Sequence, residues 1–448
     1  MPILEGDEVS GLEARYKEAL EWIFSIKRFG SKLGLEYIGH LLELMDNPQE
    51  DFRSVHVTGT NGKGSTTAMV ASILSKAGFR TGMFTSPHLS SFTERIQINS
   101  CQIPLDDVLK LVDEIRPLCK EMEIDPGLRH PTFFEIVTAM AFQYFSDRRV
   151  DFAVIEVGMG GRLDATNVVK ALVSVITNVG LEHTKVLGNT VLEIAEKKAG
   201  IVKKGGVLVT ATQDDEVYLL LEEICSVVGS RIFRVGTDII FKRLSTNYEG
   251  QRFRLEGIRH KYKGLNLPLL GKYQLLNAAV AVGTVEALGF HGVNVPVEAI
   301  EKGLKNVEWP GRMEVVQRSP LVLLDVAKDI EAMKAVKEAL LSEYTSEKLI
   351  AVVSISSDKK IPQMIAELSQ VVDRYVITVH RVLGRAADPL LIVSEAHRHG
   401  KPSEIVPNVK EAIARAITLA GGNGMVIIVG SVFLVGEARE IWFESKNP

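Results

Sequence analysis

The chain has 448 residues, of which 46% are hydrophobic and 24% are charged, and its formal net charge is −4 at pH 7. These values are typical of a soluble globular protein with two or three domains, and they give no indication of a basic surface for nucleic acid. The three cysteines form no C-x-x-C pair, which argues against both a disulfide framework and a zinc site.

Neither end of the chain carries a targeting or membrane-spanning pattern. The first residues, MPILEGDEVSGLEARYKEAL, are acidic where a signal peptide would be basic and then apolar. The longest apolar candidate, residues 424–436, is short and interrupted by Gly and Ser, so we interpret it as a buried strand and a turn. We therefore expect a cytoplasmic protein with no membrane partner.

Short, continuously apolar runs recur along the chain and are predicted to be buried strands. Helical patterns lie between many of them, and this alternation is typical of parallel sheets covered by helices on both faces. The predicted strands are 54–58, 152–157, 173–177, 207–210, 322–325, 349–354, 375–379 and 425–429. The predicted helices are 65–77, 132–147, 189–203, 274–289, 327–342 and 408–420.

Two segments indicate how the chain is divided. Residues 232–270 alternate apolar and polar side chains between turn residues, which predicts a small antiparallel insertion. The Pro-Gly pair within 306–313 precedes a new series of strands and helices, so we place a domain boundary there. The prediction is an α/β protein with a mostly parallel P-loop-type domain, 1–310, followed by a smaller Rossmann-like domain, 311–448.

A glycine-rich loop follows the first predicted strand and precedes a helix. Its sequence, GTNGKGST, covers residues 59–66 and does not fit the common pattern G-x-x-x-x-G-K-[ST], because Gly64 separates Lys63 from Ser65. Successive backbone N–H groups, a helix N-terminus and a lysine can nevertheless bind a polyphosphate, and a hydroxyl can hold Mg²⁺. We predict a nucleotide site here, since a purely structural turn needs neither the lysine nor two hydroxyls.

Other polar residues are ambiguous by themselves. Glu156 ends a predicted strand, a position suited either to a metal ligand or to a helix cap. His183 lies in a loop, and Lys198 in a helical pattern where a solvated side chain is the ordinary interpretation. Gln274 and Asn277 share one helix face, where two amides can contact a nucleotide, cap a backbone group or face solvent.

Several segments, in order along nearly the whole chain, resemble one protein family. They are RFGSKLGLEYI (28–38), GTNGKGST, TSPHLSSFTERIQIN (85–99), HPTFFEIVTAMAF (130–142), EVGMGGRLDATN (156–167), NVGLEHTKVLG (178–188), EIAEKKAGIVKKG (193–205), LPLLGKYQLLNAAVA (267–281), WPGRMEV (309–315) and GSVFLVGEARE (430–440). The chain resembles the folylpolyglutamate synthase and dihydrofolate synthase branch of the Mur ligase superfamily. The resemblance also accounts for the unusual loop, because the family has its own form of it.

The resemblance implies a reaction in two steps. ATP phosphorylates a carboxylate of a folate or pteroate, and the amine of L-glutamate then displaces phosphate to form an amide. It implies ATP as co-substrate, Mg²⁺, with two ions expected, and a carbamylated Lys198. It also implies a monomer whose partners are small molecules.

The family's site residues can be matched to positions in this sequence. The resemblance implies that Ser65, Ser86, Glu156 and His183 contact Mg²⁺, and that the catalytic set is Lys63, Glu156, His183, Lys198 and Lys328. It assigns ATP to Asn61, Gly62, Lys63, Gly64, Ser65, Thr66, Asn277, Arg312 and Asp325. The substrate-side loops are matched by Thr132, Phe133, Phe134, Arg162, Leu163, Asp164 and Ala165.

One segment departs from the family pattern D-G-A-H-N-P. Residues 325–330 read D-V-A-K-D-I, so that Lys328 stands where the family has His. A lysine can still pair with a phosphate or carboxylate. The departure leaves open a related ligase that uses a different acid or amino acid, and a catalytically weak nucleotide-binding protein. Retention of the other site residues favours an active ligase.

Overall fold

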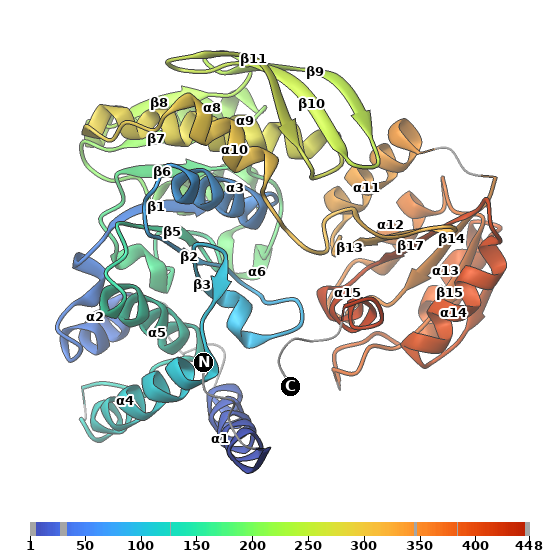
Figure 1. Ribbon diagram of the computed structural model, residues 1–448, viewed down its shortest axis with the longest axis horizontal. Helices are drawn as coiled ribbons and strands as arrows, with labels where there is room; N and C mark the ends of the chain where they lie inside the picture. Colours follow the sequence, from blue (N-terminus) through green and yellow to red (C-terminus); the bar gives the residue numbers. More distant parts are fainter. Residues whose placement is uncertain (1–5, 27–33, 126, 345–346, 383, 444–448) are drawn as a thin grey trace.

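A computed structural model describes residues 6–26, 34–125, 127–344, 347–382 and 384–443 (Figure 1). Residues 28–33, which contribute to the family resemblance, lie outside these ranges. The predicted α/β class is confirmed, with a mostly parallel sheet in the first part of the chain and a second sheet in the last part. Among the described helices, none has both the length and the apolar character needed to cross a membrane.

The first sheet has eight strands. β1 lies near its centre, and its side chains are therefore almost all buried. Only β3 and its two neighbours, β2 and β4, pair antiparallel. In sheet order the strands are β4 (Cys101–Gln102), β3 (Ile96–Ile98), β2 (Thr81–Phe84), β5 (Phe152–Glu156), β1 (Arg53–Thr58), β6 (Val173–Ile176), β7 (Val207–Thr210) and β8 (Arg231–Arg234).

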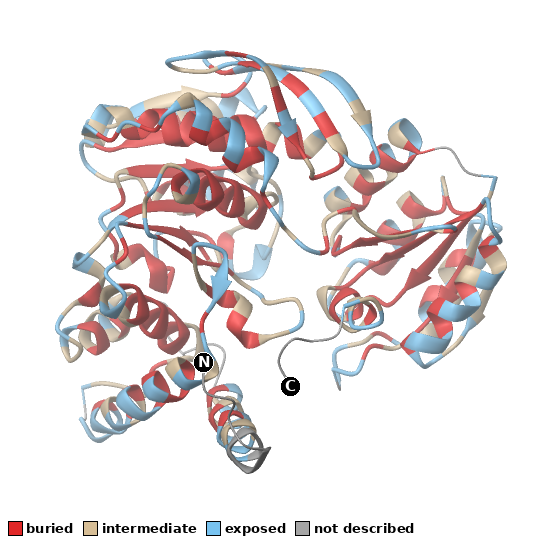
Figure 2. Ribbon diagram, in the orientation of Figure 1, coloured by how far each residue is buried: buried red, intermediate tan, exposed pale blue. Residues whose placement is uncertain are grey.

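Helices cover both faces of this sheet, so the strands are buried from both sides (Figure 2). One face packs against α3 (Lys63–Lys76), α9 (Lys272–Ala287) and α10 (Val297–Lys305). The opposite face packs against α1 (Gly6–Ser25), α2 (Glu36–Glu43), α4 (Leu105–Ile124), α5 (Phe133–Asp147), α7 (Val191–Ala199) and α8 (Asp215–Val228).

The predicted antiparallel insertion is a three-stranded sheet, but it begins later than expected. Its strands are β9 (Ile240–Asn247), β10 (Gly250–Glu256) and β11 (Lys261–Leu267). Residues 231–234, at the start of the predicted insertion, instead form β8 and pair in parallel with β7. Alternation of polar and apolar residues therefore marked a strand here but could not tell which sheet it joins.

The second sheet has six strands and lies after α10. In sheet order these are β12 (Glu314–Arg318), β13 (Leu321–Asp325), β17 (Met425–Val429), β14 (Leu349–Val353), β15 (Arg374–Ile377) and β16 (Ser403–Ile405). One face packs against α11 (Ile330–Glu343), α12 (Ile361–Leu368) and α13 (Pro389–Arg398), and the other against α14 (Val409–Ala420) and α15 (Val432–Arg439).

The interpretation of residues 424–436 as a strand and a turn is half wrong. The strand is β17, but Ser431 then caps a helix, α15, by accepting a hydrogen bond from the backbone N–H of Phe433. Gly436 lies inside this helix. Only glycine fits at this position, because a Cβ atom would lie 2.1 Å from the carbonyl oxygen of Leu89. The glycine that suggested a turn therefore permits a close contact between the two parts of the chain.

Candidate active site

The glycine-rich loop joins β1 to α3 and exposes the N-terminus of that helix. Gly62 is the N-cap residue with a φ of 83°, and no side chain caps the helix. The Nζ atom of Lys63 donates hydrogen bonds to the carbonyl oxygens of Gly59 (2.7 Å) and Thr60 (3.1 Å). Uncapped helical N–H groups and an ammonium group at one place form a favourable site for an anion.

The end of β6 holds this loop in place. The Oδ1 atom of Asn178 accepts hydrogen bonds from the backbone N–H groups of Thr60 (3.1 Å) and Asn61 (2.9 Å). The hydroxyl of Thr177 donates to the carbonyl oxygen of Asn61 at 2.6 Å. These bonds fix the loop from the β6 side and leave the first N–H groups of α3 without a side-chain cap.

Gln274 and Asn277 on α9 pack against the loop and the start of α3. Gln274 Nε2 donates to the hydroxyl of Ser65 (3.3 Å), and Asn277 Nδ2 donates to Gln274 Oε1 (3.0 Å). A Cβ atom at Gly62 would lie 2.3 Å from Asn277 Oδ1. Ser65 and Thr66 are buried, so their hydroxyls face the protein interior in this structure.

Replacing Gly62 by Ala is therefore expected to lower stability by about 2–4 kcal/mol, from the positive φ and from overpacking against Asn277 together. The Gly78→Ala variant is a matched control, because Gly78 has a φ of +93° but nothing within 4 Å of its Cβ position. Urea unfolding of both variants separates the two contributions. An equal loss in both would show that the Asn277 contact is not a constraint.

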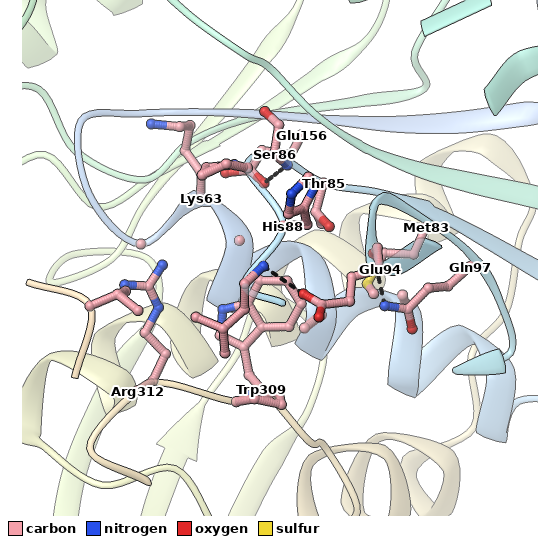
Figure 3. A pocket seen from close by; sticks show the side chains of 18 of the residues that line it. Lys63, Met83, Thr85, Ser86, His88, Glu94, Gln97, Glu156, Trp309 and Arg312 are labelled. Carbon is pink, nitrogen blue, oxygen red and sulfur yellow. Dashed lines mark hydrogen bonds between the residues drawn. The ribbon is translucent and has the colours of Figure 1, made fainter. Parts of the chain in front are cut away.

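A cavity of about 730 Å³ opens at this end of α3, between the two sheets (Figure 3). Side chains from both parts of the chain line it. The sequence-predicted residues that it brings together are Asn61, Gly62, Lys63, Gly64, Ser86, Glu156, His183, Arg312 and Lys328. The predicted residues that do not line it are Ser65, Thr66, Thr132, Phe133, Phe134, Arg162, Leu163, Asp164, Ala165, Lys198, Asn277 and Asp325.

Glu156 is a buried carboxylate at the cavity wall. One of its oxygens accepts a hydrogen bond from the backbone N–H of Ser86 at 3.0 Å. Burial raises the pKa of Glu156, and the charges of Lys63, Arg312 and Lys328 oppose that rise. Nearby cations favour the ionised form of this carboxylate. Because it accepts few hydrogen bonds, the ionised carboxylate can also bind a metal ion.

A second acidic group, Glu182, lies next to Lys198. The two side chains form an ion pair, and Lys198 is 1% exposed. Burial alone would raise the pKa of Glu182, but the charges of Lys63 and Lys198 lower it. Burial, and then the charge of Lys63, lower the pKa of Lys198 to about 8. The helical pattern alone indicates a solvated lysine. In the structure the last turn of α7 instead packs against the 158–167 loop. A Cβ atom at Gly161 would lie 2.7 Å from the Lys198 carbonyl oxygen.

His183 reaches the cavity from the short helix α6 (Thr184–Leu187), which it precedes with a left-handed φ of 44°. Partial burial and the charges of Lys359 and Lys63 lower the pKa of His183, against the opposing effect of Glu182. The imidazole is therefore largely neutral near pH 7, which is the form that can bind a metal or accept a proton.

Two cations flank the first strands of the second sheet, Arg312 before β12 and Lys328 after β13, and Asp325 positions them. The buried carboxylate of Asp325 accepts hydrogen bonds from the backbone N–H groups of Met313 (3.0 Å) and Ala327 (2.8 Å), and from the hydroxyl of Tyr273 (3.3 Å). These bonds hold the residues adjoining Arg312 and Lys328. Lys328 is exposed to the cavity, where partial burial and the charges of Lys63 and Arg312 lower its pKa.

The predicted substrate-side loops lie on the α5 face of the sheet. Thr132 caps α5, and its side chain and backbone N–H both bond to Glu135. Phe133 stacks on Phe24 with ring centroids 5.7 Å apart, and Phe134 lies 6.0 Å from Phe84. Both aromatic rings therefore have packing partners within the protein.

Residues 162–165 are occupied mostly by internal contacts. The buried carboxylate of Asp164 accepts hydrogen bonds from the backbone N–H of Met159 (2.8 Å) and the hydroxyl of Thr166. Arg162 pairs with Glu196 at 3.2 Å, and Ala165 is buried. Leu163 is 47% exposed, and Arg162 is also exposed.

The cavity residues that were not singled out from the sequence include Glu182, His88 and Trp309. His88 Nδ1 accepts a hydrogen bond from Arg95 Nε at 2.8 Å, and burial, followed by the charge of Arg95, lowers its pKa to about 3. Each lies within a segment that carries the family resemblance, but no spacing rule identifies these residues, because the fold brings them together.

The fit of a divalent cation can be judged from the donors present. Within the described residues, no three His, Cys, Asp or Glu side chains are grouped closely enough to hold a metal ion. Ser86, Glu156 and His183 nevertheless line one cavity. Mg²⁺ in proteins is commonly bound through one or two carboxylates together with substrate phosphates and water. The donor set therefore fits Mg²⁺ that a nucleotide helps to hold.

Comparison with known proteins places this geometry in a family. Residues 57–285 match the Mur ligase middle domain, and residues 311–432 match the Mur ligase glutamate ligase domain. The chain is 32% identical over 431 residues to the dihydrofolate synthase/folylpolyglutamate synthase of Bacillus subtilis, covering 95% of this chain and 98% of that protein.

A relative from Haloferax volcanii is longer. The chain is 36% identical over 440 residues to its probable bifunctional folylpolyglutamate synthase/dihydropteroate synthase, covering 97% of this chain but only 51% of that protein. This chain thus spans about half of the length of that relative. Among solved structures, the Mycobacterium tuberculosis folylpolyglutamate synthase complexed with ADP matches with a TM-score of 0.91 and 32% identity, covering 97% of this chain and 99% of that one.

Proposed function

Because the chain belongs to the Mur ligase family, in the branch of the folylpolyglutamate and dihydrofolate synthases, we propose that it is an ATP-dependent ligase that adds L-glutamate to a folate or pteroate carboxylate. The observation that carries the proposal is the shared cavity. It brings the uncapped end of α3, a buried carboxylate and cations from both sheets to one place.

The residues divide the two chemical steps between them. In the first, a carboxylate oxygen of the acceptor attacks the γ-phosphorus of ATP, ADP leaves, and an acyl phosphate forms. The loop 59–64 and the cations Lys63 and Arg312 would hold the phosphates in line and stabilise the charge on the transferring group. Ser65 and Thr66 would contribute through the backbone at the start of α3, because their hydroxyls are buried.

In the second step the glutamate amine attacks the acyl carbon, inorganic phosphate leaves, and the amine loses a proton. We assign Lys328 to the incoming carboxylate or the departing phosphate, since it faces the cavity from the second sheet. The proton of the amine passes to the departing phosphate or to water, and His183, whose lowered pKa keeps it neutral, stays available as a metal ligand. Closure of the two halves would keep water from the acyl phosphate.

Glu156, Ser86 and His183 are the groups that we propose to hold Mg²⁺, with two ions in the complete site. The ions would neutralise phosphate oxygens when bound. Asn277 and Asp325 would act on ATP indirectly, Asn277 by supporting Gly62 and Asp325 by holding the backbone beside Arg312. The residues on the α5 face, Thr132 to Phe134 and Arg162 to Ala165, would bind the pterin side of the acceptor after rearrangement.

We further propose that the two halves meet at residues 310–311, and that the protein is a cytoplasmic monomer. The boundary is supported by the passage from α10 to β12 and the second sheet after Lys305. The three cysteines are free thiols, which suits a reducing compartment.

The proposed function is tested by phosphate release from ATP and Mg²⁺. Dihydropteroate, tetrahydrofolate and no acceptor are each supplied with and without glutamate, and the products are weighed by mass spectrometry. We expect release to require both an acceptor and glutamate, and to yield a product heavier by one glutamyl unit. Nucleotide binding without turnover on either acceptor would instead favour a different acid or amine, or a weak catalyst.

Carbamylation of Lys198 is a separate proposal, supported by its burial and its pKa of about 8. The neutral amine reacts with CO₂, so we expect bicarbonate to activate CO₂-depleted enzyme faster above pH 8 than below it. The carbamate would place two anions together at Glu182, an arrangement that a cation must offset. Lys198→Met should lose this activation, whereas Lys197→Met, which removes a half-buried neighbour that donates to the carbonyl oxygen of Val186, should retain it. Bicarbonate-independent activity of the unaltered enzyme would contradict the proposal.

The segment 325–330 supports one alternative, a ligase for another amino acid. Lys328 places a flexible cation where the family has His, and it is exposed in the cavity. If the chain accepts glutamate poorly, Lys328→His is expected to improve kcat/KM for glutamate relative to the amino acid that the unaltered chain prefers. An equal change for both amino acids would show that this residue does not select between them.

A further inference from the structure

The indole of Trp309 occupies the space that a side chain would fill in an ordinary phosphate loop. In the common pattern, the residue after the lysine is Ser or Thr, and its hydroxyl reaches the metal and the phosphates. Here that residue is Gly64. A Cβ atom at Gly64 would lie 2.7 Å from Cζ2 and 3.5 Å from Nε1 of Trp309, so the glycine is required for the indole to pack there.

The indole N–H has no hydrogen-bond partner among the described residues, although its Nε1 atom is buried. A buried donor without a partner destabilises the protein. By contrast, Trp442 Nε1 donates to Gln317 Oε1 at 3.4 Å. Trp309 lines the cavity together with Lys63, Gly64 and Arg312, as Figure 3 shows for the labelled side chains.

We propose that Trp309 Nε1–H donates a hydrogen bond to a phosphate oxygen of the nucleotide bound at the N-terminus of α3. This inference rests on the nucleotide part of the proposed function, not on the identity of the acceptor acid. An indole N–H only donates, so it cannot replace the hydroxyl as a metal ligand, but it can replace it as a donor to oxygen. The segment 309–312 would then supply both a neutral donor and the Arg312 cation to one phosphate group.

Neighbouring atoms cover Nε1 in this structure, so a ligand oxygen reaches it only after the indole or the 306–313 segment shifts. That segment connects α10 of the first part of the chain to β12 of the second. A bond from Trp309 to the nucleotide would therefore link occupancy of the phosphate loop to the position of the second sheet. Nucleotide binding would then give the unpaired indole N–H of Trp309 a hydrogen-bond acceptor.

The direct test observes the indole N–H itself. The unaltered full-length chain, labelled with ¹⁵N at tryptophan, has three indole signals, from Trp22, Trp309 and Trp442. They are assigned through the Trp22→Phe and Trp442→Phe variants, and the chain is titrated with Mg²⁺ and AMPPCP, a non-hydrolysable ATP analogue. We expect the Trp309 proton to move downfield as a hydrogen bond forms, while Trp442 stays in place.

The second measurement uses Trp309→Phe, which keeps an aromatic ring beside Gly64 and removes only the N–H donor. A lost hydrogen bond to a charged group should weaken AMPPCP binding by about 10- to 100-fold. Trp442→Phe is the control, because its indole bonds to Gln317 outside the cavity, and it should bind within twofold of the unaltered chain. If Trp309→Phe does not fold, the NMR titration of the unaltered chain still decides the question.

The outcomes separate this inference from the proposed function. AMPPCP binding with an unmoved or upfield-shifted Trp309 signal, or with an unweakened Trp309→Phe variant, overturns the inference and leaves the ligase proposal standing. Failure of the unaltered chain to bind AMPPCP overturns both. Acceptor or glutamate specificity different from that proposed leaves the result for Trp309 unaffected, since neither substrate is present in the titration.

Discussion

Replacing Lys63 by Met is expected to reduce kcat by about 10²–10³-fold, the usual effect of removing one preorganised charge or donor from a transition state. Lys63 lies at the first position of α3, where its ammonium group is held over the loop by the carbonyl oxygens of Gly59 and Thr60. Its charge also acts across the cavity, because it shifts the pKa values of Glu156, Glu182, His183, Lys198 and Lys328. The variant would lose both the phosphate contact and this field.

The measurement is phosphate release with ATP, Mg²⁺, acceptor and glutamate, together with AMPPCP affinity. Lys170→Met is a suitable control, since Lys170 is 83% exposed, pairs with Glu50 and does not line the cavity. Urea unfolding of Lys63→Met checks its folding, because the carbonyl oxygen of buried Gly59 loses a donor in this variant. Activity of the variant within tenfold of the unaltered enzyme would show that this loop does not bind the reacting phosphates.

The strands were predictable from the sequence wherever burial on both faces requires a continuous run of apolar residues. Strands such as β5 and β17 are buried on both faces and read as uninterrupted apolar runs. β2 is not predicted because it is short and contains Gly82, and β8 is assigned to the antiparallel insertion because it begins and ends with arginine. The sequence predicts a turn where the short helix α15 forms. Its glycine, Gly436, is needed for a tertiary contact with Leu89, and no local pattern reveals that contact.

The site was predictable where chemistry and backbone coincide, as in the loop 59–64 and at Glu156. It was not predictable where three-dimensional contacts decide the environment of a residue. Lys198 has the sequence context of a solvated helical lysine but is buried against Glu182. Asp164 matches a substrate residue of the family, yet its carboxylate is occupied by Met159 and Thr166. Trp309 became notable only when its neighbour, Gly64, was seen in space.

Replacing Glu156 by Gln is expected to reduce kcat by about 10²-fold or more and to raise the Mg²⁺ concentration needed for half-maximal activity. Metal-assisted charge stabilisation is worth several kcal/mol, and each 1.4 kcal/mol corresponds to about tenfold in rate. Gln keeps the shape of the side chain and can still accept the hydrogen bond from Ser86, but it removes the negative charge that faces three cations. The measurement is an Mg²⁺ titration of phosphate release at saturating ATP.

Stability provides the contrast that makes this test specific. Burial raises the pKa of Glu156, so the folded protein holds its proton more tightly than the unfolded chain, and ionising the group costs stability as pH rises through that folded pKa. Glu156→Gln should therefore leave the free energy of unfolding at pH 7 unchanged or raise it. Glu286 is the matched control, a buried carboxylate that accepts hydrogen bonds from the backbone N–H groups of Arg259 and His260 and from the Tyr262 hydroxyl.

Glu286→Gln should do the opposite, lowering stability because its donors lose an anionic acceptor while the Mg²⁺ dependence stays the same. The two carboxylates are similarly buried and differ in what surrounds them. Glu286 accepts from two backbone N–H groups and the Tyr262 hydroxyl and lies 3.1 Å from His260 Nδ1, whereas the described residues offer Glu156 one backbone N–H and three cations at the edge of a cavity. A loss of stability without a change in Mg²⁺ dependence in Glu156→Gln would make Glu156 a structural residue and remove it from the proposed metal site.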